Sequence, residues 1–566
     1  MVAREKGLEQ PLGTAEVAHL LREIGQTELT DETPHRARAY YRAAENLLTV
    51  TEPLDQMIAE GRLREIPGVG PAITEKIVAL HRTGTHRTLE RLREAIPASA
   101  LELLRIPGLG AQKARQLYQD LRIASIDELE EACRRDALVD VRGFGPAMQR
   151  KALQGIEMLR RSRRHRLINH ADEFLAAIVA NLQRSSTELE RIEPAGDVRR
   201  GCDLVCDLRL AGRIAVPMSS VQTVSINDEV DLYVADEPRY GVALLLATGS
   251  AAHVEALQRF AESRNLRLGP EGLRQGGKLI PCPEERDVYD KLGLPFISPE
   301  LRESGDEVAL AAEGRLPELV EQEDLHGVLH CHTDRSDGVN SLEEMAEAAR
   351  QRGYRYIGVA DHSRSAGYAG GLSVEQVEAQ LAEIDRLNRG YRGRFHILKG
   401  IESDILPDGS LDYPDEVLAR FDLVVASVHS RFRLDREAQT ARIVRAVSNP
   451  FTTILGHPTG RLLLRRDGYD VDVDRVLQAC AEDGVVVEIN CNPRRLDLDW
   501  RWHRRGLELG CLFSINPDAH SIAELDFMRW GVAAARKGGL AKARILNVLN
   551  SKAMTTRLRE RKSKVV

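Results

Sequence analysis

Histidines and carboxylates recur through the C-terminal part of the chain, each at or just past the end of an apolar run. Because apolar runs alternate with helical segments from Asp324 onward, the pattern predicts βα units. The carboxyl ends of parallel strands share one face of a barrel, so these side chains are expected to converge on one rim. The set comprises six imidazoles and three carboxylates: His330, His332, Asp337, His362, Glu402, His429, His457, Asp518 and His520.

Imidazoles and carboxylates mixed in this way are typical metal ligands. Mixed nitrogen and oxygen donors suit manganese, iron or zinc better than the all-oxygen sites of magnesium and calcium. Nine ligands exceed what one ion takes, so two or three clustered ions are expected. Such a cluster activates water, orients a phosphate and stabilises a leaving oxygen. The sequence therefore predicts metal-dependent hydrolysis of a phosphoester.

Residues 324–566 resemble a PHP (polymerase and histidinol phosphatase) domain on the strength of these nine positions. The resemblance implies a distorted (β/α) barrel with a trinuclear metal site, and it assigns all nine side chains as ligands. One position departs from the pattern: Val328 stands where relatives commonly have an aspartate, two residues before the first metal histidine. That position is not a ligand, so the departure concerns support of the ligands rather than metal binding itself.

Three Gly-x-Gly turns separate amphipathic helical stretches within residues 14–160. Glycine permits positive φ and close approach of the backbone to another molecule, and the helix that follows offers free N–H groups to a phosphate. The turns resemble helix-hairpin-helix motifs, which hold DNA backbone without reading sequence. Any one of them alone could equally be an ordinary helix–helix turn. Their glycines are Gly68, Gly70, Gly108, Gly110, Gly143 and Gly145.

Taken in order, these segments resemble the bacterial family X DNA polymerases that carry a C-terminal PHP domain, over nearly the entire chain. The resemblance implies a multidomain fold of α and α/β parts. Its expected parts are a helical, lyase-like N-terminal domain (1–95), a helical fingers-like domain (96–165), a nucleotidyltransferase-like α+β palm (166–250), a thumb-like part (251–302), an acidic linker (303–323) and the PHP domain (324–566).

The polymerase pattern is broken where its metal carboxylates should lie. The family supplies an Asp-x-Asp pair and a third aspartate to hold two magnesium ions. Here Asp207 and Asp231 match the first and third positions, but Arg209 occupies the second. The phosphate-binding turn also carries Asp197 in place of a serine, which would repel a triphosphate. Templated synthesis is therefore expected to be absent or vestigial, with Mg²⁺ needed only if this site works.

Three cations in the polymerase part have two interpretations each. Lys76 matches the Schiff-base lysine that some relatives use to remove a 5′-deoxyribose phosphate, a role that requires a depressed pKa; the alternative is an ordinary solvated helix lysine. Arg199 and Arg200 follow the altered turn and are candidate ligands for DNA phosphate; the alternative is that they pair with nearby acids.

Composition narrows the remaining possibilities. The chain has 566 residues and a net charge of −7, which excludes a globally basic coat for nucleic acid. Eight cysteines without a CxxC pair predict buried thiols in a reducing compartment. The absence of a long apolar run and of a signal-like N-terminus favours a cytoplasmic protein without membrane contact, expected as a monomer.

The expected function is a manganese-, zinc- or iron-dependent DNA-repair nuclease, acting on 3′ ends of gapped or damaged duplex held by the N-terminal motifs. The family resemblance implies 3′-5′ exonuclease activity in the PHP domain, with possible 3′-phosphatase activity or cleavage at abasic sites. The alternative is a working gap-filling repair polymerase with an associated 3′-5′ exonuclease. A non-catalytic scaffold for DNA ends and a small-molecule phosphatase that has acquired DNA-binding helices form a third class.

Overall fold

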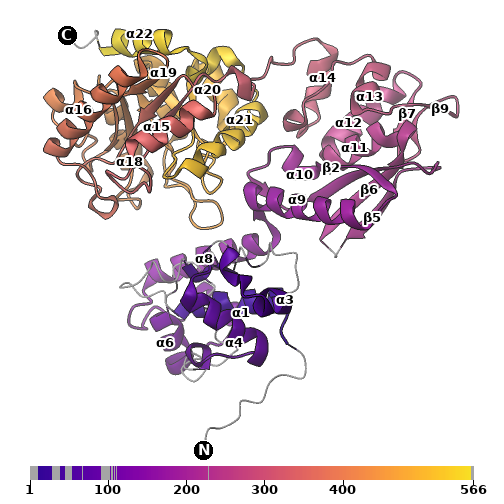
Figure 1. Ribbon diagram of the computed structural model, residues 1–566, viewed down its shortest axis with the longest axis horizontal. Coiled ribbons are helices and arrows are strands. Elements are labelled where there is room, and N and C mark those ends of the chain that lie inside the picture. Colours follow the sequence, from indigo (N-terminus) through magenta and orange to yellow (C-terminus); the bar gives the residue numbers. More distant parts are fainter. Residues whose placement is uncertain are drawn as a thin grey trace, which may run out of the picture. The chain divides into compact units, whose positions relative to one another are not determined.

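The computed structural model describes residues 11–27, 39–41, 43–44, 47, 54–66, 68–90, 102–103, 106, 109, 111–226 and 229–562. The chain divides into two compact units, Met1–His165 and Arg166–Val566 (Figure 1). Among the described residues, no helix combines the length and apolar character that a bilayer span requires. The mixture of helical, α+β and barrel parts confirms the predicted multidomain fold class.

The first unit is helical wherever it is described, as its amphipathic patterns predict. Apolar residues at helical spacing, such as Ile73, Ile77 and Leu80, are buried in its core. Ser125 begins one helix with a capping box that Glu128 completes. The α-helices are α1 (Thr14–Thr27), α3 (Leu54–Ala59), α4 (Pro71–Thr83), α6 (Ala111–Leu121), α7 (Ile126–Arg134) and α8 (Pro146–Arg164).

The palm part of the second unit is built on a four-stranded sheet of order β2-β4-β6-β5, in which β4 and β6 are parallel. Helix α11 packs on β4 and β6 and is buried nearly all round, as its apolar sequence requires. The elements are α9 (Ile168–Ser185), β2 (Leu189–Ala195), α10 (Gly196–Arg199), β4 (Leu208–Ile214), β5 (Gln222–Ile226), β6 (Val230–Asp236) and α11 (Tyr240–Thr248).

The thumb part combines helices with a small antiparallel sheet of order β7-β8-β9. Helix α14 (Asp306–Ala312) lies inside the segment expected as a linker and packs against α12 (Ala251–Glu262). The Oε1 atom of Glu307 in α14 lies 2.6 Å from Nδ1 of His253, and both residues are buried. Glu307, one of the acidic residues of this segment, therefore makes a buried contact, so the segment does more than connect two domains. The other elements are β7 (Arg267–Gly269), β8 (Gly272–Gln275), β9 (Lys278–Ile280) and α13 (Glu285–Leu292).

The C-terminal part is a distorted barrel of parallel strands. One sheet has the order β10-β11-β12 and the other β13-β14-β15-β16-β17. A parallel bridge between Cys331 and Ala519 joins β10 to the chain after β17, and one between His362 and Glu402 joins the chain after β11 to β13. The strands are β10 (Gly327–Cys331), β11 (Tyr356–Val359), β12 (His396–Leu398), β13 (Gly400–Asp404), β14 (Leu423–Ser427), β15 (Ile454–Leu455), β16 (Val486–Asn490) and β17 (Phe513–Asn516).

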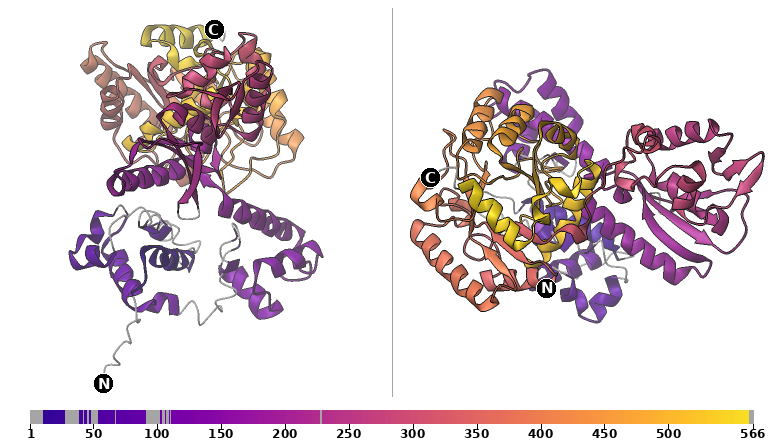
Figure 2. Two further views of the ribbon diagram at one scale, coloured as in Figure 1. Left: turned by 90° about the vertical axis from the view of Figure 1, so that its right-hand side faces the viewer. Right: turned by 90° about the horizontal axis from the view of Figure 1, so that it is seen from above.

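Helices follow the strands and cover the outside of the barrel (Figure 2). The predicted capping boxes at Ser341 and Ser373 are present, and Gly484 ends α19 with a φ of 66°. The strands are buried on both faces, so a polar side chain within them must find an internal partner. The main helices are α15 (Leu342–Gln351), α16 (Val374–Tyr391), α18 (Arg436–Val447), α19 (Val473–Asp483), α20 (His503–Leu509), α21 (Met528–Lys537) and α22 (Ser551–Lys562).

The eight cysteines are all free thiols. Six are buried, as predicted: Cys133, Cys282, Cys331, Cys480, Cys491 and Cys511. The prediction is wrong for Cys206, which is exposed, and for Cys202, which is only partly buried. Cys202 lies between α10 and the short strand β3 (Leu204–Val205), and Cys206 directly follows β3; both thiols contact the carboxylate of Asp197 rather than an apolar core.

Candidate metal centre

The strand ends of the barrel bring the nine predicted side chains to one place. Glu402 lies on β13, while His332, His429 and His457 follow the carboxyl ends of β10, β14 and β15 by one or two residues. His330, at an irregularity of β10, has a φ of 58°. A bulge of this kind re-aims a side chain, and positive φ at non-glycine residues clusters at functional sites.

Three overlapping groups of ligand atoms form within this cluster. His332 Nε2 lies 3.1 Å from Asp518 Oδ1, and His457 Nε2 lies 3.0 Å from Glu402 Oε1, so His457 joins the groups through Glu402. The groups are His332, Asp337, His362 and His520; His330, His332 and Asp518; and His362, Glu402 and His429. His332 and His362 each belong to two of these groups. Two or three adjacent ions would require ligands that are shared in this way.

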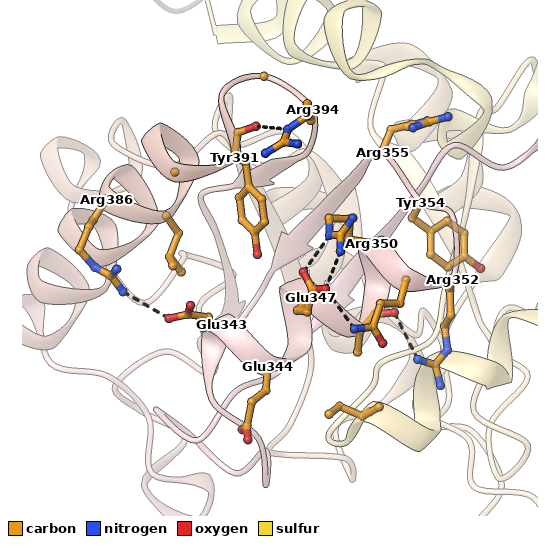
Figure 3. Close-up of a pocket in the computed structure, with 16 residues that line it drawn as sticks. Glu343, Glu344, Glu347, Arg350, Arg352, Tyr354, Arg355, Arg386, Tyr391 and Arg394 are labelled. Atoms are coloured by element: carbon orange, nitrogen blue, oxygen red, sulfur yellow. Dashed lines mark hydrogen bonds and ion pairs between the residues drawn. The ribbon is translucent and has the colours of Figure 1, made fainter.

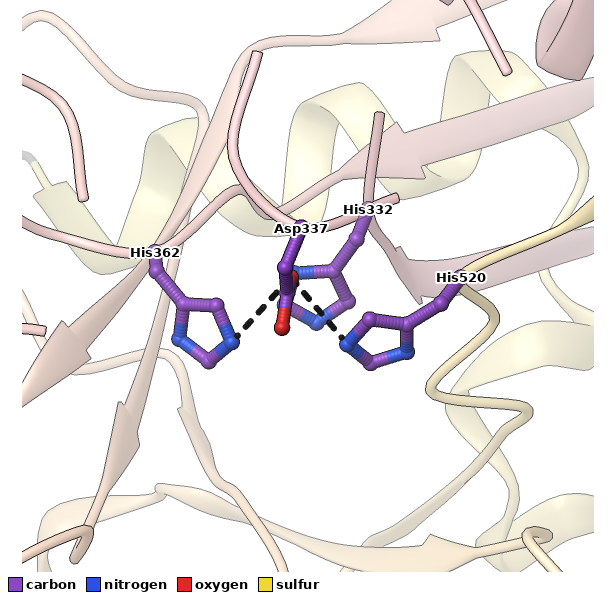
Figure 4. A group of neighbouring side chains, drawn as sticks. All are labelled: His332, Asp337, His362 and His520. Atoms are coloured by element: carbon purple, nitrogen blue, oxygen red, sulfur yellow. Dashed lines mark ion pairs between the residues drawn. The ribbon is translucent and has the colours of Figure 1, made fainter. Parts of the chain in front are cut away.

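Asp337 lies between two imidazoles in the first of these groups (Figure 4). Its Oδ1 atom is 3.5 Å from His362 Nε2 and 3.3 Å from His520 Nε2. The side chains of Asp337 and His520 are 35% and 30% exposed, whereas His330, His332 and Glu402 are fully buried or nearly so. The cluster is therefore open to solvent on the side of Asp337 and His520.

Several buried polar atoms of the cluster make no hydrogen bond and fit bound cations. His362 Nδ1 lies 3.0 Å from Glu402 Oε2 and His330 Nε2 lies 3.3 Å from Glu402 Oε1, in ion-pair contacts without hydrogen-bond geometry. The five buried ligand atoms without a hydrogen bond within the described protein are His330 Nε2, His332 Nδ1, His362 Nδ1, Glu402 Oε2 and His457 Nδ1. Buried polar atoms without partners are rare in native structures, and each costs free energy. A set of imidazole nitrogens and carboxylate oxygens left open in one place suits manganese, zinc or iron(II).

At His332 and Glu402 the electrostatics favour the ligating form. Burial, followed by the nearby His520 and His362, lowers the pKa of His332 to about 3, so this imidazole is neutral at pH 7. Burial favours the protonated form of Glu402, but the surrounding histidines, His429 first, outweigh it and hold the pKa of this carboxyl well below its usual range. Neutral imidazole and ionised carboxylate are the forms that bind metal. At His362 burial lowers the pKa, but Glu402 and Asp337 outweigh it and raise the pKa to about 10, so this imidazole holds a proton that a metal ion would displace.

A further set of carboxylates supports the ligands from behind, and the sequence predictions missed it. Glu488 Oε2 lies 2.6 Å from His330 Nδ1, and its Oε1 accepts the backbone N–H of His457 at 3.0 Å. Asp404 Oδ1 lies 2.6 Å from His429 Nδ1. Such partners fix the orientation of a metal-binding histidine. The signal was present in the sequence, since Glu402 and Asp404, like Glu488 and Asn490, alternate on one face of otherwise apolar runs.

A surface hollow of the barrel lies away from the cluster. It measures 1290 Å³ and is lined by charged residues of α15, α16 and the segments that follow them (Figure 3). Its charges pair with one another, as in Glu347 with Arg350 at 2.6 Å and Glu343 with Arg386 at 3.6 Å. None of the nine predicted metal ligands lines this hollow, so it belongs to the outer helical layer rather than to the centre.

In the palm, Arg209 forms an ion pair with Asp207, a carboxylate that would otherwise be available to a metal ion. Its guanidinium lies 2.7 Å from Asp207 Oδ2, and Arg209 pairs in register with Asp231 across β4 and β6. Asp197 is buried, and its Oδ2 accepts the backbone N–H groups of Cys206 and Asp207, each at 2.9 Å. The structure thus places Asp207 directly before β4 and Asp231 on the neighbouring β6, with Arg209 in ion-pair contact with Asp207 where the family has a third carboxylate.

The other predicted cations are engaged within the protein. Arg199 pairs with Glu285 at 2.7 Å, and the buried Arg200 pairs with Asp197 and with Glu303. Lys76 on α4 lies 3.3 Å from the carbonyl of Ala72. These ion pairs agree with the alternative that Arg199 and Arg200 pair with nearby acids. The roles of Arg199, Arg200 and Lys76 in DNA chemistry stay predictions.

The glycine turns have the geometry that close backbone contact needs. Gly68 and Gly143 have φ values of 83° and 85°, and Gly70 is the N-cap of α4. A side chain added at Gly70, Gly143 or Gly145 would meet nothing within 4 Å, so these turns face open space. The glycines of the middle turn, Gly108 and Gly110, lie outside the described residues.

Family models match four parts of the chain. Helix-hairpin-helix models match residues 13–86, and a SAM-like helix-hairpin-helix tandem matches 60–122 and 100–151. The DNA polymerase beta thumb model matches residues 243–303. The PHP domain model matches residues 328–492, which hold seven of the nine candidate ligands.

Two kinds of relatives are similar to the chain. The DNA polymerase/3′-5′ exonuclease PolX of Bacillus subtilis (strain 168) is 34% identical over 550 residues, which cover 93% of this chain and 95% of the relative. A "probable phosphatase" of Thermoanaerobacter sp. (strain X514) is 27% identical over 253 residues, 42% of this chain and 95% of the relative. Another of Aliivibrio fischeri is 26% identical over 234 residues, 39% of this chain and 89% of the relative.

Proposed function

The chain belongs to the PolX family of family X DNA polymerases with a C-terminal PHP domain, and on that premise we propose that its principal activity is 3′-5′ exonucleolytic hydrolysis of DNA at the PHP metal centre. The helix-hairpin-helix and thumb parts bind the duplex, and the barrel hydrolyses the terminal phosphodiester. The substrates are 3′ ends at gaps or damaged sites in DNA repair.

One observation carries the proposal: nine imidazoles and carboxylates, of which Asp337 is exposed and the other eight are buried or half-buried, converge with five ligand atoms that make no hydrogen bond. His330, His332, Asp337, His362, Glu402, His429, His457, Asp518 and His520 would hold two or three manganese, zinc or iron ions. Bound ions supply the Lewis acidity that activates water and stabilises the leaving 3′-oxygen.

The protein contributes a fixed and largely dry setting for this chemistry. Glu488 and Asp404 orient His330 and His429, so little reorganisation is needed when substrate arrives. The exposed edges of Asp337 and His520 leave one direction for a phosphodiester to approach. The remaining walls are buried, which excludes bulk water from the reacting centre.

The proposal also includes the loss of polymerase activity from the palm. Arg209, paired with Asp207, occupies the position of the missing metal carboxylate. The phosphate-binding turn carries Asp197, which pairs with Arg200 and accepts two backbone N–H groups, where the family has a serine hydroxyl. Loss of a metal carboxylate costs several kcal/mol of transition-state stabilisation, roughly a thousandfold or more in rate. We expect no useful rate of nucleotide incorporation from this palm.

The test uses the manganese-loaded full chain and an end-labelled primer annealed to a template. Shortening of the primer from its 3′ end, abolished by Glu402→Ala and retained by Asp207→Ala, is the expected result. Shortening that survives Glu402→Ala would place the activity outside the barrel. Metal-dependent turnover of histidinol phosphate without turnover of DNA would point instead to a small-molecule phosphatase, and no turnover of either would favour a scaffold for DNA ends.

A gap-filling polymerase is the second candidate, favoured by the thumb match and by the adjacent Asp207 and Asp231. Its test adds dNTPs and Mn²⁺ to the same primer–template with the Glu402→Ala variant, which removes degradation. Template-directed extension that disappears on further substitution Asp207→Ala would establish this activity. Unextended primer would rule it out under these conditions.

A further inference from the structure

Two exposed apolar side chains mark the loops that follow β10 and β11. Val339 and Tyr368 are 74% and 72% exposed, the highest values among the large hydrophobic residues exposed in the described chain. Tyr368 is the single aromatic residue in that exposed set. Isolated apolar side chains on a surface are ordinary, but two of them beside an active centre indicate a binding surface.

Both residues lie next to predicted metal ligands. The ring centroid of Tyr368 is 6.2 Å from that of His362 and 6.4 Å from that of His429. The backbone N–H of Val339 donates a hydrogen bond of 2.8 Å to the carbonyl of His520. Because His520 is one of the two ligands that reach solvent, the exposed pair belongs to the open side of the centre.

The loop that carries Tyr368 is held firmly to the same framework as the ligands. The backbone N–H of Ser365 donates to Asp412 at 2.7 Å, and its hydroxyl donates to Asp404 at 3.2 Å. Asp404 also binds His429, so one carboxylate positions both the loop and a ligand. The N–H of Leu372 donates to the carbonyl of His362 at 2.9 Å and closes the loop.

The two loops also touch each other. A side chain at Gly370 would lie 3.3 Å from the carbonyl oxygen of Ser336, so the loop after β11 packs directly on the loop after β10. The N–H of Gly338 donates to the carbonyl of Thr333 at 3.0 Å and tightens the second loop. The two exposed side chains therefore rise from one continuous and ordered surface.

We propose that Val339 and Tyr368 form an apolar ledge that seats the terminal nucleobase of a DNA 3′ end while its phosphodiester lies at the metal centre. This inference rests on the proposed exonuclease function and specifies how its substrate is recognised. A base presents two apolar faces, and stacking on an aromatic ring tolerates every base. The ledge would thus select a nucleic-acid 3′ end, frayed from its template, over a small phosphate ester.

The experiment compares two single-stranded oligonucleotides with the manganese-loaded full chain. One ends in a 3′ thymidine and the other in a 3′ tetrahydrofuran residue, which keeps the phosphodiester but lacks a base. For the thymidine end, Tyr368→Ala should raise KM about tenfold with little change in kcat, since stacking contributes to binding. Tyr368→Phe should behave as the unaltered protein, and the base-less end should be cleaved equally by all three.

Controls separate recognition from damage to the centre. Manganese content measured by mass spectrometry should be the same in Tyr368→Ala as in the unaltered protein. Val339→Ala should raise KM for the thymidine end by a smaller factor, and the matched change Val216→Ala, at a 59% exposed valine of the palm, should leave it unchanged. Equal loss of activity on both ends, or no change on the thymidine end, would overturn the ledge. Failure of the unaltered protein to cleave either oligonucleotide would instead overturn the proposed function.

Discussion

The carboxylate of Glu488 illustrates how single residues determine the metal centre. Its two oxygens accept from His330 Nδ1, the N–H of His457 and the side-chain amides of Asn490 and Asn516. All of these groups are buried, so each donor depends on Glu488 for its partner. A ligand thus keeps its orientation only while the residue behind it stays charged.

The substitution Glu488→Gln should weaken manganese binding about 10- to 100-fold, because an amide nitrogen faces donors that the carboxylate accepted. Equilibrium dialysis with metal analysis gives the affinity. The matched control Glu482→Gln changes an exposed glutamate of α19 and should leave affinity unchanged. Unaltered metal affinity in Glu488→Gln would show that His330 does not need this partner.

A second residue-scale prediction concerns acid stability. Burial opposes ionisation of Glu285, but Arg302 and Arg199 outweigh it and lower the pKa to about 2. A carboxyl with a depressed folded-state pKa contributes stability above its unfolded value, and this contribution is lost as pH falls from about 4.5 toward 2. In Glu285→Gln the fall in unfolding free energy over that window should be shallower. Urea unfolding at several pH values measures this slope, and a slope equal to that of the unaltered protein would contradict the prediction.

At the scale of elements, capping residues and turns determine where helices begin and which groups can reach their N-termini. The capping boxes at Ser341 and Ser373 form because a serine lies three residues before a glutamate or glutamine. Gly70 caps α4 at an ordinary φ of −88°, so another residue can adopt its conformation. A side chain at Gly70 would occupy the open space in front of the N-terminus of α4.

The substitution Gly70→Ala should therefore preserve folding and reduce DNA affinity several-fold, because the added methyl group keeps a phosphate from the N–H groups of α4. Fluorescence anisotropy with a gapped duplex measures affinity, and thermal unfolding checks the fold. Gly390→Ala, at an open helical glycine of α16, is the control and should not change binding. Equal DNA affinity in Gly70→Ala would indicate that this turn does not contact the backbone.

At the scale of the whole molecule, the palm, thumb and barrel belong to one compact unit, Arg166–Val566. Contacts between these parts are specific: Lys537 Nζ donates to the carbonyl of Arg200 at 3.0 Å, and Arg461 lies 3.2 Å from Asp203. Trp530 and Leu496 of the barrel pack in the core of the palm. The palm and thumb parts are thereby tied to the barrel by buried contacts.

Chelation of metal should consequently affect only one of two unfolding transitions. Metal that binds the native centre at about 100 times its Kd stabilises that unit by about 2.7 kcal/mol. Calorimetry with excess EDTA should therefore lower the Tm of the transition of residues 166–566 and leave that of residues 1–165 in place. A shift of both transitions, or of neither, would contradict the assignment of the metal centre to the second unit.

The sequence predicted which side chains converge better than it predicted how the segments between domains pack. Residue types and spacing indicated the convergence of nine side chains, because parallel strand ends must share a rim. The segment 303–323 was expected as a linker, and its helix α14 was missed because its burial depends on α12 rather than on its own composition. Glu488 and Asp404 were missed because a carboxylate behind a ligand is indistinguishable in sequence from one beside it.

The sequence by itself supplied the candidate ligand set, the expected order of domains and the arginine, Arg209, at the position of a metal carboxylate, since each is a matter of residue type and order along the chain. Only the tertiary structure decided which carboxylates orient the histidines, which side of the centre is open, and that Val339 and Tyr368 share one surface. These depend on distances between residues far apart in sequence, which are set when the strands close into a barrel and the polar atoms buried there must find partners inside the protein.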